Sequence, residues 1–120
     1  MKLVYAAHSK HYFFFTRHIT KFVLENNCVP LNPFMIHDYF LLDSVERETV
    51  RESNNELVRR ADELWVFGPV SDGVLEEIKL ANKLLKPIRY FEIIRSRDIT
   101  EISKEEVKLE ENLEQFRIHL

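Results

Sequence analysis

Residues 63–94, ELWVFGPVSDGVLEEIKLANKLLKPIRYFEII, decide the fold, because they contain a strand, a turn, a helix and a second strand in succession. ELWVF (63–67) is a short apolar run ended by a Gly-Pro pair, which is typical of a buried strand. Residues 73–85 have apolar side chains at helical spacing, and a Lys-Pro pair ends this helix before the strand in IRYFEII (88–94). Two strands joined by a crossover helix predict a parallel pair covered by that helix.

The residues before this unit repeat the same order of elements. The other expected elements are strands at 2–7 and 28–34 and helices at 12–27 and 43–61. Asp43 and Glu46 are a plausible capping pair for the second of these helices. Strands alternating with helices predict a single-domain, doubly wound α/β fold with a parallel sheet of four to five strands. We expect the α/β domain to span residues 1–95.

The tail, residues 96–120, follows this domain. Ser103 with Glu106 has the spacing of a capping box, and Leu109, Leu113 and Phe116 follow. This pattern predicts an amphipathic C-terminal helix, which packs either on the domain or on a partner subunit.

Composition narrows the classes of function. The chain has 120 residues, 45% of them hydrophobic, and a formal net charge of -3 with acidic and basic residues interspersed, so no long nucleic acid is expected as a partner. The single cysteine, Cys28, excludes an internal disulfide and favours a reducing compartment. No apolar run approaches the roughly 18 residues of a membrane span. We therefore expect a cytoplasmic protein without membrane contact.

The helix at 73–85 opens with two adjacent carboxylates that differ in direction. Glu76 turns outward toward Lys79 and Lys83, where an ion pair is expected, whereas Glu77 lies on the flank of the apolar stripe. A carboxylate on such a flank costs several kcal/mol unless it is hydrogen-bonded, paired or beside a wet cavity. Glu77 is therefore either a pocket carboxylate or a group satisfied within the protein.

The loop before Glu77 favours a pocket. Parallel sheets of this kind bind ligands beyond the carboxyl ends of their strands, and Ser71, Asp72 and Gly73 follow such an end. Gly73 permits a close approach, and Ser71 with the amides at the helix start could hold an anion such as a phosphate. Asn54 is an amide within an apolar stripe and needs a partner, which is either the backbone or a ligand.

These residues resemble the signature of the nucleoside 2-deoxyribosyltransferase superfamily. DGVLEEIKLANKLLKPI matches it at Gly73, Glu77, Ala81 and the following Lys-Pro pair, and LVYAAHS resembles the first strand of that superfamily, with Tyr5 at its pocket tyrosine. NNELVRRADELWVFG is similar to its second helix and third strand. The longer pattern is closer still to an uncharacterised branch of the superfamily, and the resemblance covers residues 2 to about 93.

The resemblance implies a flavodoxin-like Rossmannoid fold that cleaves or transfers an N-glycosidic bond without a cofactor or metal. Glu77 stands in the place of the nucleophile that attacks the anomeric carbon, and Tyr5 orients it. Ser71 falls where nucleotide-hydrolysing relatives hold a 5′-phosphate, and Ser9 and Lys10 could join it. The expected partners are a small nucleoside or nucleotide and a second copy of the chain, as a homodimer or higher homo-oligomer.

The sequence departs from the superfamily at two places. Catalytic relatives carry aspartate at the position of Asn54, and asparagine can hold a base but cannot protonate it; the loop AAHSKH also lacks the glycine turn of the nucleotide-hydrolysing relatives. His8 or His11 could supply the proton instead. The alternative function is a nucleotide-binding module without turnover, and a third is a structural protein in which Glu77 is satisfied internally.

Two further segments allow more than one interpretation. The aromatic run YFFF (12–15) favours core packing or a subunit contact over stacking on a base. DYFLLD (38–43) is either a pocket lid or a hydrophobic cover of the core.

Overall fold

The computed structural model describes residues 1–37, 41 and 43–120, which form a five-stranded sheet with the order β2-β1-β3-β4-β5. The strands are β1 (Leu3–His8), β2 (Val29–Leu31), β3 (Glu63–Phe67), β4 (Ile88–Ile94) and β5 (Asp98–Ile102). The helices are α1 (Thr16–Glu25), α2 (Pro33–Ile36), α3 (Arg47–Arg60) and α4 (Asp72–Lys83), with 3-10 helices η1 (Lys10–Phe15) and η3 (Glu114–His119). Strands β1 to β4 run parallel.

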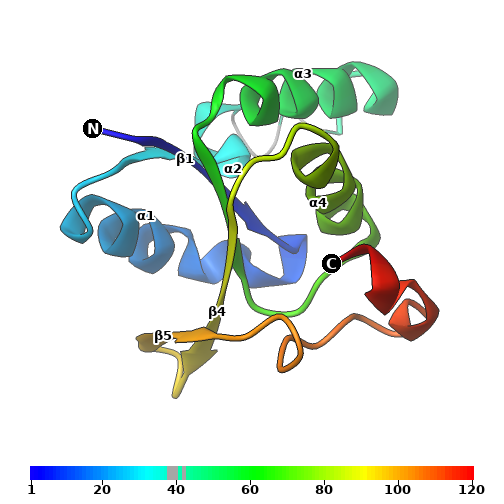
Figure 1. The fold of residues 1–120 in the computed structure, drawn as a ribbon. Helices are drawn as coiled ribbons and strands as arrows, with labels where there is room; N and C mark the ends of the chain where they lie inside the picture. The colour runs from blue at the N-terminus through cyan, green and yellow to red at the C-terminus, as the bar shows by residue number, and fades with distance from the viewer. Residues whose placement is uncertain (38–40, 42) are drawn as a thin grey trace.

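Helices cover both faces of the sheet, with α1 on one side and α3 and α4 on the other (Figure 1). Alternation along β1 and β3 divides the core accordingly. Val4 and Trp65 pack with Ile19 of α1, whereas Tyr5 and Leu64 belong to the cluster that includes α3 and α4 side chains. This arrangement confirms a single α/β domain with a mostly parallel sheet.

The expected parallel sheet is wrong at one edge. Strand β5 runs antiparallel to β4, with Ile93 opposite Ile99, after a tight turn in which Arg95 and Ser96 have positive φ. Arg89 also donates two hydrogen bonds across this pair to the carboxylate of Glu101, at 3.0 and 2.7 Å. Residues 98–102, which we predicted to belong to the C-terminal tail, therefore form a hairpin with β4 and extend the sheet.

The predicted amphipathic helix in residues 96–120 is also wrong. Glu106 does accept hydrogen bonds from the amide and hydroxyl of Ser103, but no α-helix follows; the only helix in residues 96–120, all of them described, is the 3-10 helix η3 near their end. Instead Val107 is buried, and residues 108–110 pair with Val70 through two backbone hydrogen bonds of 2.8 Å. The tail ends in η3, which packs on α4 of the same chain. Burial and strand-like pairing outweigh the local preference for a helix here.

Two helix starts differ from expectation. Helix α3 begins at Arg47, with Glu46 as an N-cap that makes no side-chain hydrogen bond, so the predicted capping pair is wrong. The aromatic run lies in η1 rather than in α1, and Tyr12 from it packs directly over Gly68 at the end of β3. The segment 38–43, predicted to be either a pocket lid or a hydrophobic cover of the core, lies mostly outside the described residues.

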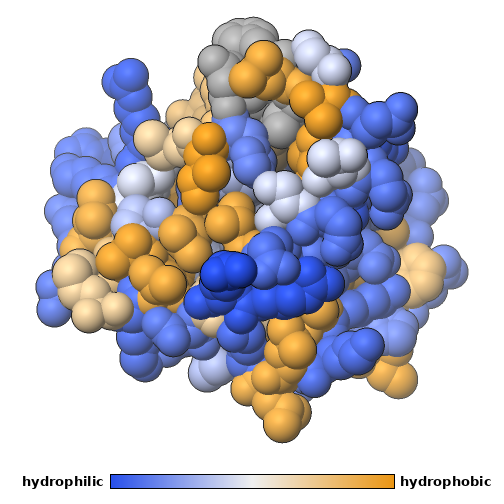
Figure 2. Space-filling model, turned by 90° about the horizontal axis from the view of Figure 1, so that it is seen from above, coloured by the Kyte–Doolittle hydropathy of each residue, from blue (hydrophilic) through white to orange (hydrophobic). Residues whose placement is uncertain are grey.

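Within the described ranges, no helix has both the length and the apolar character needed to cross a bilayer. The face seen from above is mostly hydrophilic, with hydrophobic residues gathered mainly in its left half and at its lower tip (Figure 2). The most exposed large hydrophobic side chains are Leu85, Phe14 and Ile118. Exposed hydrophobic residues are thus spread over several elements and do not belong to one segment.

Candidate functional site

A cavity of about 290 Å³ opens at the carboxyl ends of β1 and β3. Strand β1 lies between β2 and β3. The connection from β1 leads to β2 on one side of it, and the connection from β2 leads to β3 on its other side, so the order of strands reverses at β1. The lining comprises His8, Ser9, Lys10, His11, Pro33, Phe34, Arg47, Val50, Arg51, Asn54, Ser71, Asp72, Gly73, Val74, Glu77 and Glu110. All the substrate-binding residues predicted from the sequence line this one cavity.

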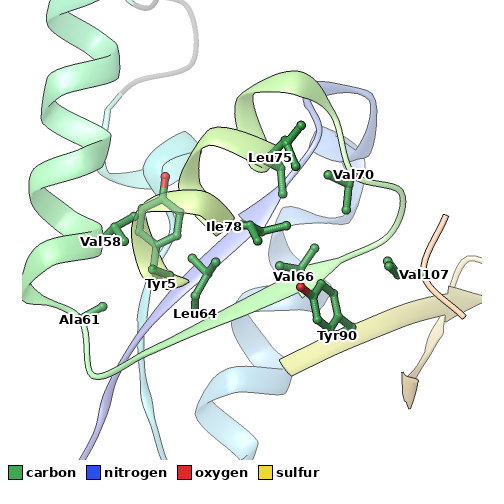
Figure 3. Close-up of a cluster of buried hydrophobic side chains, with 13 residues drawn as sticks. Tyr5, Val58, Ala61, Leu64, Val66, Val70, Leu75, Ile78, Tyr90 and Val107 are labelled. Carbon is green, nitrogen blue, oxygen red and sulfur yellow. The ribbon is translucent and has the colours of Figure 1, made fainter. Parts of the chain in front are cut away.

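Glu77 lies at the back of the cavity and is 6% exposed. Its Oε2 accepts a hydrogen bond of 2.5 Å from the hydroxyl of Tyr5, which belongs to β1. The Tyr5 ring lies within the apolar cluster between Val58 and Ile78, with its hydroxyl pointing away from the ring's apolar neighbours (Figure 3). Tyr5 is therefore not a wall of the cavity but fixes the carboxylate from below.

Burial raises the pKa of Glu77 to about 7, although the hydrogen bond from Tyr5 and the charge of Arg51 both lower it. Burial, followed by the neighbouring charge of Glu77, raises the pKa of Tyr5 well above its usual value, so the phenol stays protonated and donates. Near neutral pH, Glu77 is therefore present in both its charged and its neutral form. A carboxyl group poised in this way is typical of functional sites.

Glu76 behaves as an ordinary surface residue. Its carboxylate lies 3.5 Å from the ammonium group of Lys79, as predicted, and more than half of its side chain is exposed. The adjacent glutamates of α4 thus face opposite environments, as the helical spacing indicates.

The start of α4 is already capped by its own side chains. Ser71 Oγ accepts from the amide of Val74 at 3.3 Å, and Asp72 Oδ1 accepts from the amide of Gly73 at 2.8 Å. The predicted supply of free amides for an anion is therefore reduced, and the carboxylate of Asp72 repels a negative ligand. Gly73 does permit a close approach, but the group beside it is the guanidinium of Arg51.

Asn54 has a buried carbonyl without a partner. Its side-chain Oδ1 makes no hydrogen bond to any described residue, although the residue lines the cavity. The expected partner is thus not the backbone. A buried acceptor of this kind costs roughly 1 to 3 kcal/mol while it stays unpaired, so a ligand that donates to it gains that free energy.

His8 is held in its neutral form. Its Nδ1 lies 2.9 Å from the carbonyl of Ser9 and its Nε2 lies 3.1 Å from the amide nitrogen of Asn32, so Nδ1 donates and Nε2 accepts. Burial lowers the pKa of His8, and its ring stacks on Phe34. His8 is consequently a poor proton donor, and its role is to shape the wall.

His11 and Glu110 meet at the mouth of the cavity. Nδ1 of His11 lies 3.4 Å from Oε2 of Glu110, which the pairing of the tail with Val70 brings to this edge. The His11 side chain is largely exposed. Of the two histidines considered from the sequence, His11 is therefore the one whose ring is in contact with solvent.

The sequence analysis missed several residues of the site. Arg47 and Arg51 precede Asn54 by seven and three residues, so all three lie on one face of a helix. Helical spacing alone could therefore have predicted both arginines as residues of the site. Phe34 and Glu110 gave no such signal, because a short helix and a tail pairing bring them into place.

Residues 4–91 match a protein family described as a domain of unknown function (DUF7768), a range that contains nearly all of β1, all of β2, β3 and α4, and most of the cavity lining. No curated protein matches the chain. Lys108–Glu110, which pair with Val70, lie outside the matched range.

Proposed function

The chain belongs to the DUF7768 family, and we propose that it cleaves or transfers the N-glycosidic bond of a nucleoside or nucleotide. In this proposal the family is a branch of the nucleoside 2-deoxyribosyltransferase superfamily with a flavodoxin-like fold. The observation that carries the proposal is the position of Glu77. Its carboxyl group is buried beside a cavity, and among the described residues its hydrogen-bond partner is the Tyr5 hydroxyl alone.

The chemistry follows from that position. The charged form of Glu77 attacks the anomeric carbon, the carbon–nitrogen bond breaks, and its electron pair leaves with the base, which takes up a proton. The sugar is then held as an ester of Glu77 until water or a second base displaces it. Tyr5 holds one carboxylate oxygen and leaves the other for the sugar.

The base needs a hydrogen-bond partner and a proton. The unpaired carbonyl of Asn54 suits an amino group on the base, and asparagine cannot protonate it. Since both nitrogens of His8 are engaged, His11 beside Glu110 is the proposed proton donor. Lys10 supplies positive charge to the same wall for a 5′-phosphate.

The test is a search for free base. Purified protein is incubated with each common deoxynucleoside, ribonucleoside and 5′-monophosphate, and the products are separated by chromatography. We expect base release from at least one of them, and its loss in Glu77→Ala. No release from any compound, or equal release by Glu77→Ala, contradicts the proposal.

A second candidate is a nucleotide-binding module without turnover, favoured by asparagine at position 54. It predicts that a nucleotide raises the melting temperature while no base is released. Asn54→Asp separates the candidates, because it restores the group that catalytic relatives use. Base release that appears only in Asn54→Asp supports the second candidate.

A homodimer remains a prediction from the resemblance. Light scattering of the purified chain measures its mass directly, and a monomer at all concentrations contradicts it.

A further inference from the structure

Arg51 connects α3 to the turn of α4 that precedes Glu77. Its Nη1 donates a hydrogen bond of 3.2 Å to the carbonyl of Gly73. Its Nη2 and Nη1 lie 3.6 and 3.7 Å from the position that a Cβ on Gly73 would occupy, which is ordinary van der Waals contact. The guanidinium therefore covers this turn on the side that faces the cavity, whose wall Arg51 also forms.

The carbonyl that Arg51 binds has a second role. In an α-helix the amide of residue i donates to the carbonyl of residue i−4, so the amide of Glu77 donates to the carbonyl of Gly73. Arg51 and the backbone of Glu77 thus share one acceptor. A movement of Arg51 would therefore directly affect the position of the helical turn that leads to Glu77.

The guanidinium of Arg51 has no ion-pair partner within the described part of the chain. Arg59 and Arg60 at the other end of α3, in contrast, pair with Glu56. A guanidinium is always charged and presents five donors in a rigid fork. Arg51 therefore brings a positive charge to the lining of the cavity.

Several titratable groups surround Glu77. Tyr5 and His8 come from β1, Arg47 and Arg51 from α3, Asp72 from α4, Lys10 and His11 from η1, and Glu110 from the tail. Apart from burial, the groups that shift the pKa of Glu77 are Tyr5, through its hydrogen bond, and Arg51, through its charge. Arg47 lies one turn earlier on the same helix and has no such effect.

We infer that Arg51 is a positioning residue: its hydrogen bond to the Gly73 carbonyl fixes the turn that leads to Glu77, and its guanidinium places a positive charge in the cavity that Glu77 lines, so that the carboxylate stays in place for attack. The catalytic meaning of this inference rests on the proposed function. The contact itself does not, because the ionisation of Glu77 can be measured without turnover.

The experiment compares Arg51→Gln, which keeps a donor but loses the charge, with Arg51→Lys and the matched control Arg47→Gln. The Glu77 carboxyl carbon is followed by ¹³C NMR against pH, with Glu77→Gln identifying its signal. In Arg51→Gln we expect the pKa of Glu77 to rise by about one pH unit, because an opposite charge nearby is lost. Arg51→Lys should restore most of it, and Arg47→Gln should leave it near the wild-type value.

Base release gives the second readout. If Glu77 must be charged, kcat/KM at pH 6 falls about tenfold in Arg51→Gln, while the loss shrinks at higher pH. A merely structural role would lower activity equally at every pH.

The outcomes separate this inference from the proposed function. An unchanged pKa of Glu77 in Arg51→Gln overturns the inference, even if base is released. An equal rise in Arg47→Gln overturns it as well. A raised pKa in a protein that releases no base supports the contact and contradicts only the proposed function.

Discussion

Glu63 and Glu77 are both buried, at 8% and 6% exposure, but of the two only Glu77 lines the cavity, and they differ in their partners. Glu63 begins β3 and is fully engaged: its Oε2 accepts from the ammonium of Lys2 at 2.6 Å and its Oε1 from Nε1 of Trp65 at 2.9 Å. Glu77 belongs to α4 and lines the cavity, and among the described residues its side chain accepts a hydrogen bond from Tyr5 alone.

The pKa of the glutamate side chain is therefore shifted in opposite directions at the two positions. Burial raises the pKa of Glu63, but the hydrogen bonds from Lys2 and Trp65 together outweigh it, so the pKa lies below the usual value. For Glu77 burial dominates, and the pKa is raised to about 7. The comparison shows that burial alone does not mark a functional carboxylate; the mark is burial with too few partners and room for a ligand.

The largest expected effect is on activity. Glu77→Gln keeps the shape of the side chain but cannot form the sugar ester, so we expect base release to fall roughly 10³-fold or more. Glu63→Gln should keep base release within a few-fold of wild type, since Glu63 does not line the cavity. Chromatography of released base measures both variants. Similar losses in both would remove the distinction between the two carboxylates.

The next effect is on the pH dependence of stability. The pKa of Glu77 is higher in the folded than in the unfolded chain, so the folded state holds more protons between about pH 4.5 and 7. Stability contributed by Glu77 is complete below pH 4.5 and is lost as the pH rises through 7, by about 3 kcal/mol in total. Glu63 has the opposite sign, and its contribution is lost as the pH falls.

Urea unfolding of wild type and Glu77→Gln across this range measures the effect. The free energy of unfolding of wild type should decline relative to the variant as the pH rises. A constant difference between the two proteins would show that Glu77 is as acidic as an exposed glutamate.

The sequence predicted the part of this comparison that depends on local spacing. Helical periodicity separated Glu76 from Glu77, and the succession of strands and helices placed the carboxyl ends of β1 and β3 at one crevice, whereas Tyr5 was named from the family resemblance alone. It also identified the strands at 63–67 and 88–94 with their observed bounds. These features are set by residues close in sequence, for which periodicity is a strong signal.

The sequence could not predict what depends on contacts between distant segments. Local spacing contains no signal for the buried carboxylate of Glu63, because its partner Lys2 is 61 residues away in sequence and Trp65 has the pattern of an ordinary core residue. The tail failed for the same reason: the burial of Val107 and the pairing of residues 108–110 with Val70 are tertiary effects that override a helix signal. Glu110 therefore entered the site unpredicted.

A smaller effect is expected on stability when Glu63 loses its acceptor. Glu63→Met removes both oxygens and leaves Nε1 of Trp65 buried without a partner, which costs about 2 kcal/mol. Urea unfolding at pH 7 measures the loss, and base release should remain. A stability equal to that of wild type would indicate that water reaches the indole nitrogen and that this end of the sheet is also open.

The smallest effect concerns the other partner of Glu63. The Lys2 side chain is 64% exposed, so its ion pair is screened by solvent, and Lys2→Met should destabilise less than Glu63→Met. The loss should also shrink in about 1 M salt, because ions screen an exposed pair more than a buried hydrogen bond. Unfolding curves of both variants at low and high salt measure this. A salt-independent loss as large as that of Glu63→Met would mean that the ion pair, rather than the bond from Trp65, keeps Glu63 charged.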